Sequence, residues 1–172
     1  MKFPTAWPES LQIVLFLGFY GLFHSLYFGL PDNVLRDVIH YYGIGLLCSS
    51  LIHFIAPLEQ VSAVHNHLQS PLADLVIVRG CDGAGVLFLV MAAILAFPAS
   101  LKQKLIGLLL GVAFMYTLNL VRIIGLYFVV AYHNDWFLLV HTYLAPTLFI
   151  IVACLFFAWW ALGSVRENHE PR

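Results

Sequence analysis

Long apolar runs separated by short polar segments make up most of this chain. Runs long enough for a helix to cross a bilayer lie at about 11–30, 34–56, 105–131 and 139–162, and a shorter one lies at 82–97. Continuous runs favour helices over barrel strands, which alternate in hydrophobicity. The pattern therefore predicts an all-α, polytopic transmembrane helical bundle of about five spanning helices, with residues 1–172 forming a single integral membrane domain.

The longest polar interval, 57–80, separates the second and third runs. Its apolar residues have the spacing of an amphipathic helix that lies on a membrane surface: Val61, Val64, Leu68, Leu72, Leu75 and Val76. We therefore expect an amphipathic segment outside the membrane that covers a site or recognises a partner.

The composition agrees with a membrane protein, because 62% of the residues are hydrophobic, 10% are charged and the mean hydropathy is +0.90. An ordinary soluble domain has about a quarter of its residues charged. The net charge of -1 indicates no partner, and no basic patch or nucleic-acid motif is present. The three cysteines, Cys48, Cys81 and Cys154, are too few and scattered for a disulfide framework.

Basic residues in the short loops predict the orientation. With the N-terminus outside, only Lys2 and Arg79 among the basic loop residues lie outside. Five basic residues then face the cytoplasm: Arg36, Lys102, Lys104, Arg166 and Arg172. The positive-inside rule therefore predicts an outer N-terminus and a cytoplasmic C-terminus. This topology gathers Cys81, Arg122 and His141 near the outer face of the membrane.

Arg122 is the most informative single residue, because it lies inside the apolar run 105–131. A charge within a spanning helix costs roughly 2.5 kcal/mol or more, so it needs a partner, a wet cavity or a function. A purely structural arginine paired with a lipid phosphate or with Asp135 is the alternative. Asn119 lies one turn earlier on the same helix face and is placed to orient the guanidinium or bind a substrate.

Cys81 has a polar, glycine-flanked context, Arg79-Gly80-Cys81-Asp82-Gly83. Near the start of a helix, the free amides and the dipole would favour its thiolate; the alternative is a buried, inert thiol. His141, at the outer end of the last run, is the candidate proton-transfer partner of such a thiol. His133, in the preceding turn, is the rival.

Small residues recur at helical spacing and predict close helix packing. They form the rows Gly21-x-x-x-Ser25-x-x-x-Gly29 and Gly107-x-x-x-Gly111. Pro146, inside the last run, predicts a kink just after His141.

Three motifs in order give the chain a resemblance to a known family. Cys81 precedes a short helix, Asn119-Leu120-Val121-Arg122-Ile123 follows, and His141 comes nineteen residues after the arginine. From about Gly80 to Trp160 the chain resembles the exosortase/archaeosortase family, particularly its short bacterial members of the exosortase H type. The N-terminal third carries no motif that matches.

The resemblance implies a polytopic membrane cysteine protease or transpeptidase in the inner membrane, with its site facing the periplasm. Cys81 would be the nucleophile, Arg122 the transition-state stabiliser and His141 the proton-transfer residue. Asn119, Asp82, Gly83 and His133 are the candidates for binding or orienting the substrate. The substrates would be exported proteins with a C-terminal sorting helix, and neither a cofactor nor a metal is implied. Many family members have about eight spans, so this chain is unusually small.

Two other classes of function stay open. His40 and His53 lie thirteen residues apart, a spacing that suits two stacked haems in an electron carrier, and His65-x-His67 offers two zinc ligands. In a non-enzymatic membrane subunit or transporter, Arg122 would instead line a substrate path.

Overall fold

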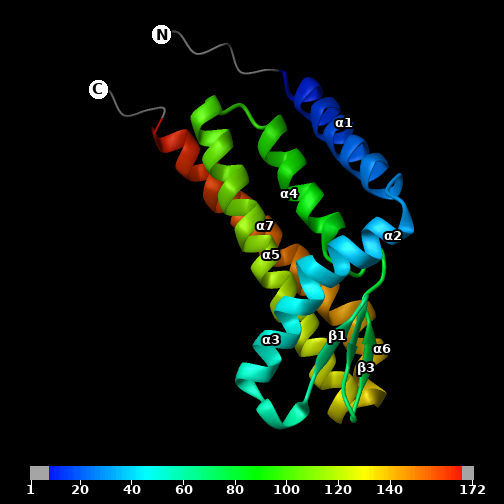
Figure 1. The fold of residues 1–172 in the computed structure, drawn as a ribbon. Helices are drawn as coiled ribbons and strands as arrows, with labels where there is room; N and C mark the ends of the chain where they lie inside the picture. Colours follow the sequence, from blue (N-terminus) through cyan, green and yellow to red (C-terminus); the bar gives the residue numbers. More distant parts are fainter. Residues whose placement is uncertain (1–7, 168–172) are drawn as a thin grey trace. The chain divides into compact units, whose positions relative to one another are not determined.

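The structure is a computed structural model that describes residues 8–167. Four of its helical stretches are long and apolar enough to cross a membrane: Glu9–Phe28, Asp32–Ile55, Leu101–Tyr132 and Asn134–Val165. A fifth apolar helix, Ala84–Ala96, is shorter. The prediction of an all-α transmembrane helical bundle is therefore confirmed (Figure 1).

The helices and strands follow the predicted runs closely, except between the second and third runs. The α-helices are α1 Glu9–Phe28, α2 Asp32–Val34, α3 Leu46–Ile55, α4 Ala84–Ala96, α5 Leu101–Tyr132, α6 Phe137–Leu139 and α7 Ala145–Glu167. The strands are β1 Ser62–Val64, β2 His67–Gln69 and β3 Asp74–Val76. Segments of π-helix at Leu35–Gly45 and Val140–Leu144 join α2 to α3 and α6 to α7, and short 3₁₀ turns lie at Pro57–Glu59 and Asn134–Trp136.

The described chain divides into two compact units. The first contains α1, α4, the part of α5 up to Met115 and the part of α7 from Ile150. The second contains residues 30–84 and 116–149, and therefore all three strands. Every residue of the candidate site predicted above belongs to this second unit.

The interval 57–80 is where the prediction of an amphipathic helix is wrong. It contains a three-stranded antiparallel sheet of order β1-β2-β3, in which Leu68 lies opposite both Ala63 and Leu75. The apolar residues of β2 and β3 are buried at every second position, as a half-buried strand requires. Pro71 interrupts any helix here, and His65 adopts a positive φ of 53° in the first hairpin turn.

The inner face of the sheet packs on α3 and α5. Leu68, Cys48 and Ile52 are fully buried in one cluster with Tyr127 of α5. The Tyr127 hydroxyl donates to the buried carboxylate of Glu59 over 2.8 Å, and the Tyr132 hydroxyl donates to the same carboxylate. These contacts fix the start of the sheet segment to the last turns of α5.

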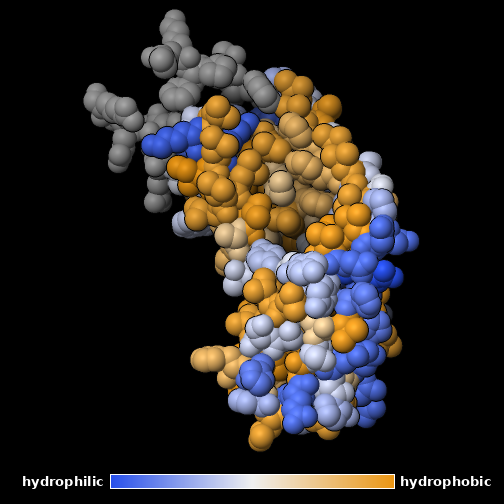
Figure 2. Space-filling view, viewed as in Figure 1, coloured by the Kyte–Doolittle hydropathy of each residue, from blue (hydrophilic) through white to orange (hydrophobic). Residues whose placement is uncertain are grey.

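In the first unit, the small residues of α5 are used for packing, as predicted. A Cβ added at Gly107 would lie 2.5 Å from Cε2 of the buried Trp160, and one at Gly111 would lie 3.2 Å from Phe156. At Gly21 of α1, an added Cβ would meet no described atom within 4 Å. Figure 2 shows that the visible surface over α1 and α4 is almost continuously apolar, as expected for a lipid-facing region.

The helix changes geometry just before Pro146. The π-helical segment Val140–Leu144 precedes this proline, which has no N–H to donate to a residue one turn earlier. The sequence predicts a kink at Pro146; the structure has a stretch of π-helix just before it, and the kink itself stays a prediction. His141 lies within it, on the unit that holds the site.

The contact between Gly107 and Trp160 is open to a direct test. We expect Gly107→Ala to lower the free energy of unfolding in detergent by about 1–3 kcal/mol, because an added methyl group overpacks a filled interface. Gly125→Ala, on the same helix, is the matched control, since an added Cβ there meets no described atom within 4 Å. Equal stability of the two variants would contradict this packing role.

Candidate active site

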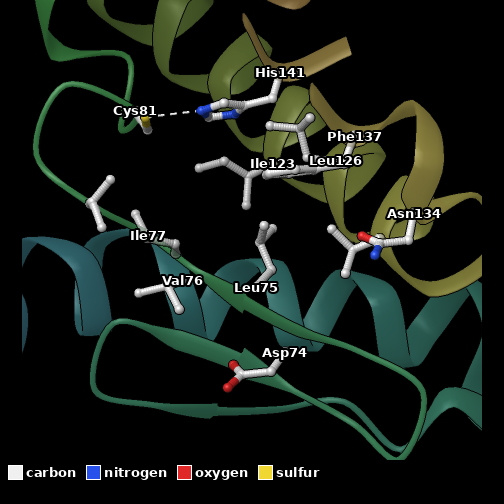
Figure 3. Close-up of a pocket in the computed structure, with 12 residues that line it drawn as sticks. Asp74, Leu75, Val76, Ile77, Cys81, Ile123, Leu126, Asn134, Phe137 and His141 are labelled. Atoms are coloured by element: carbon white, nitrogen blue, oxygen red, sulfur yellow. Dashed lines mark hydrogen bonds between the residues drawn. The ribbon is translucent and has the colours of Figure 1, made fainter. Parts of the chain in front are cut away.

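Cys81 and His141 are brought together from sixty residues apart. The Nε2 atom of His141 lies 3.3 Å from Sγ of Cys81 (Figure 3). Cys81 ends a turn that follows β3, and its N–H donates to the Val78 carbonyl over 3.0 Å. The His141 ring stacks on Phe137 with a centroid distance of 5.0 Å and an interplanar angle of 14°. The exposed His133 is not among the residues that line the cavity at this pair.

Arg122 reaches the same turn from the middle of α5. Its Nη1 donates to the backbone carbonyl of Cys81 over 3.1 Å, and its guanidinium carbon lies 5.9 Å from the centroid of the Phe149 ring. The charge is therefore directed at the cysteine backbone rather than at Asp135. Arg122 thus meets the requirement that an intramembrane charge has a polar partner.

Asn119 and Gly83 hold the backbone on the other side of Cys81. Asn119 Nδ2 donates to the Asp82 carbonyl over 2.6 Å. Gly83 has a φ of 80°, and a Cβ at this position would lie 2.5 Å from Oδ1 of Asn119. Only glycine suits both the conformation and the close approach. In this structure these residues position the cysteine turn.

His40 is a site residue that the sequence reasoning considered only as a haem ligand. Its Nε2 lies 3.0 Å from Oδ2 of Asp82, and the two side chains are only 3% and 2% exposed. The sequence could have indicated such a partner for His40, because a histidine on the buried face of an apolar helix needs a polar group to bind. The pair ties the π-helical segment Leu35–Gly45 to the residue that follows Cys81.

The histidines of the haem and zinc alternatives do not converge on one site. His40 points to Asp82, whereas His53 is exposed. His65 and His67 contact different carboxylates, Asp37 and Asp74. Within residues 8–167, no group of three or more His, Cys, Asp or Glu side chains has a metal-binding arrangement.

Burial raises the pKa of the Cys81 thiol above its ordinary value. The positive charge of Arg122 lowers this pKa and the carboxylate of Asp82 raises it, but burial is the largest of the three effects. Cys81 lies three residues before the first residue of α4, Ala84, so stabilisation of its thiolate by the helix start stays a prediction, and burial is the dominant influence on its pKa. The Cys81 sulfur nevertheless lies within hydrogen-bond reach of His141.

A cavity of about 370 Å³ opens beside the Cys81–His141 pair. Its walls are mostly apolar and come from β3 and the following residues, from α5 and from the segment after α5: Asp74, Leu75, Val76, Ile77, Val78, Ile123, Leu126, Val130, Asn134 and Phe137. In Figure 3, Leu75 faces Leu126 across the cavity, and Asp74 lies away from the pair. The cavity can hold apolar side chains next to a thiol and an imidazole.

Three buried polar atoms at the site have no hydrogen-bond partner within the described residues. They are Asn119 Oδ1, Arg122 Nε and His141 Nδ1. Each such atom costs about 1–3 kcal/mol when it stays unpaired in a protein interior. Their concentration around one cysteine is typical of a functional site, where unsatisfied groups are available to a ligand.

A comparison with known protein families identifies the family of the chain. The chain matches the family described as transmembrane exosortase (Exosortase_EpsH) over residues 10–160. It belongs to the transmembrane exosortase family. The match includes the N-terminal third, in which the sequence analysis found no family motif, so in this exosortase α1 to α3 are also family elements. Comparisons with curated proteins and with solved structures give no match.

The raised pKa of Cys81 predicts how alkylation depends on pH. In a Cys154→Ala variant, alkylation reports on Cys81, because Cys48 is fully buried. The rate of Cys81 alkylation should rise with pH to a midpoint above the ordinary thiol pKa of about 8.5. Arg122→Gln removes a charge that lowers the pKa, so the midpoint should rise further. Asp82→Asn removes a charge that raises it, so the midpoint should fall. A wild-type midpoint below neutrality contradicts this picture.

The buried pair of His40 and Asp82 predicts strong coupling. His40→Leu or Asp82→Leu should each cost roughly 3–5 kcal/mol of unfolding free energy, because each leaves the other side chain without this partner. The double variant should cost clearly less than the sum of the two. A double-mutant cycle on unfolding in detergent measures the coupling, and additive losses would show that the pair contributes nothing.

Proposed function

We propose that this exosortase is a cysteine protease or transpeptidase that cleaves exported proteins near a C-terminal sorting helix. The observation that carries the proposal is the 3.3 Å contact between Cys81 Sγ and His141 Nε2 in a member of this family. A thiol and an imidazole within hydrogen-bond reach are the minimal pair for nucleophilic acyl transfer.

The proposed reaction begins with the resting thiol. As Sγ of Cys81 attacks the scissile carbonyl, His141 Nε2 takes the thiol proton, and a tetrahedral intermediate forms. His141 then gives this proton to the leaving amine, the C–N bond breaks and a thioester remains. Water or an acceptor amine then attacks the thioester and gives a proton to His141. The C–S bond breaks, the acyl product leaves, and His141 passes that proton to the Cys81 sulfur.

Arg122 would stabilise the negative charge that develops on the carbonyl oxygen. Its Nη1 is held by the Cys81 carbonyl, whereas its buried Nε has no partner within the described residues. A donor that is already desolvated and oriented costs little reorganisation when the charge forms. The Phe149 ring and the Cys81 carbonyl together hold the Arg122 guanidinium in the orientation in which Nε can donate.

We further propose that the exosortase lies in the bacterial inner membrane with its N-terminus outside. Basic residues of the short loops then face the cytoplasm. The active site faces the periplasm, and the membrane helix of the substrate docks laterally through the lipid. Asp82 and Gly83 position the nucleophile, and the lipid bilayer and exported proteins are the partners.

Cleavage of a co-expressed reporter that carries the C-terminal sorting signal of an exported protein from the same genome tests this function. Cys81→Ala should abolish shortening of the reporter. His141→Ala should lower the rate by about 10²-fold or more, and Arg122→Ala by about 10²–10³-fold. Quantitative immunoblotting of the reporter over time, at equal enzyme levels in the membrane, provides the measurement.

Two matched controls separate chemistry from damage to the bundle. Cys154→Ala removes a different thiol, and His133→Ala removes the rival histidine; both residues are exposed, and both variants should cleave at nearly the wild-type rate. If Cys81→Ala cleaves as well as wild type, the nucleophile is wrong. If His133→Ala is inactive and His141→Ala is active, the proton-transfer residue is wrong.

A further inference from the structure

The strand β3 has one unpaired edge. In the sheet order β1-β2-β3, β3 pairs only with β2. The Ser70 N–H donates to the Ala73 carbonyl over 2.9 Å, and the Ile77 N–H donates to the Asn66 carbonyl over 2.7 Å. Residues 73, 75 and 77 therefore direct their backbone groups to β2. By the alternation of an antiparallel ladder, residues 74, 76 and 78 direct theirs to the opposite side.

The cavity at Cys81 lies along this free edge. Five consecutive residues, 74 to 78, line it. Successive side chains of a strand point to opposite faces, so a cavity that touches all five runs beside the backbone rather than over one face. Across the cavity lie the apolar side chains of Ile123 and Leu126 of α5 (Figure 3). Val130 of the same helix also lines the cavity.

The edge leads directly to the nucleophile. The Val78 carbonyl is occupied by the Cys81 N–H over 3.0 Å, which turns the chain and places Sγ at the end of the cavity beside His141. Ahead of this turn, the outward backbone groups of Asp74 and Val76 and the Val78 N–H have no partner among the residues that the structure describes. A row of donors and acceptors at strand spacing is complementary to one kind of ligand, an extended polypeptide.

We propose that the substrate binds as an added β-strand on the free edge of β3. This inference rests on the proposed function and specifies how that site recognises its substrate. Residues 74 to 78 span about 13 Å at roughly 3.3 Å per residue, which accommodates about four residues of an extended peptide. The backbone ladder holds the segment and delivers its carbonyl to Cys81.

The direction of the added strand follows from the position of the sorting helix. That helix follows the scissile bond, so the segment beside β3 is the one that precedes the bond. This segment and β3 both run toward Cys81, and the pairing is parallel. Alternate side chains of the substrate then face Leu126 and Val130, and we expect apolar residues at every second position there.

A backbone-specific variant tests the ladder. Val76→Pro removes an outward N–H without disturbing the bonds to β2, and edge positions of this kind tolerate proline. Val76→Ala removes the same side-chain contacts but keeps the N–H. With the reporter described above, we expect Val76→Pro to cleave at least about fivefold more slowly than Val76→Ala. The melting temperature of each variant reports on folding.

A second measurement leaves the enzyme unchanged. The substrates are synthetic peptides that span the cleavage site of the reporter, each N-methylated at one residue. Along this series, slow and normal cleavage should alternate from one modified position to the next. Equal cleavage by Val76→Pro and Val76→Ala, or N-methyl effects without this period, overturns strand addition and leaves the proposed function intact. If wild type does not shorten the reporter at all, the proposed function fails, and this inference fails with it.

Discussion

The close approach of Asn119 to Gly83 is the contact on which the site depends. The cysteine lies in a turn between a small sheet and a helix, and such a turn holds a side chain only if its own backbone is fixed. Asn119 Nδ2 binds the Asp82 carbonyl at 2.6 Å, and the missing Cβ of Gly83 allows the amide to reach it. Arg122 holds the Cys81 carbonyl from the next turn of α5. One helix therefore fixes the cysteine turn at two successive carbonyls.

The same constraint explains why the site is polar inside an apolar molecule. The turn is held by Asn119, Arg122 and the buried pair of His40 and Asp82, and each of these groups requires partners of its own. The partners are supplied only in part, because Asn119 Oδ1 and Arg122 Nε have no hydrogen-bond partner within the described residues. In the proposed reaction, the substrate supplies the missing hydrogen bonds and offsets this cost. His141 is held instead by ring stacking on Phe137, which leaves its Nδ1 unused.

The small sheet resolves a second problem of the bundle. The proposed binding of an extended segment requires backbone groups that are not already paired within helices, and a strand edge supplies them. An exposed edge also risks aggregation, yet β3 is only three residues long and is followed at once by the cysteine turn. Its anchor is the buried Glu59, which Tyr127 and Tyr132 hold against the end of α5.

The sequence by itself determined the apolar helices and drew attention to three candidate site residues. Long apolar runs have one solution in lipid, and Arg122 within such a run, Cys81 between glycines and His141 at a helix start were visible as exceptions. Tertiary structure decided the rest. The spacing of Val61, Leu68 and Leu75 suited an amphipathic helix, and only packing against α3 and α5 made these residues part of a sheet segment. Long-range contacts likewise chose His141 over His133 as the neighbour of the thiol, gave His40 its partner and raised the pKa of Cys81, because burial depends on what surrounds a group in space.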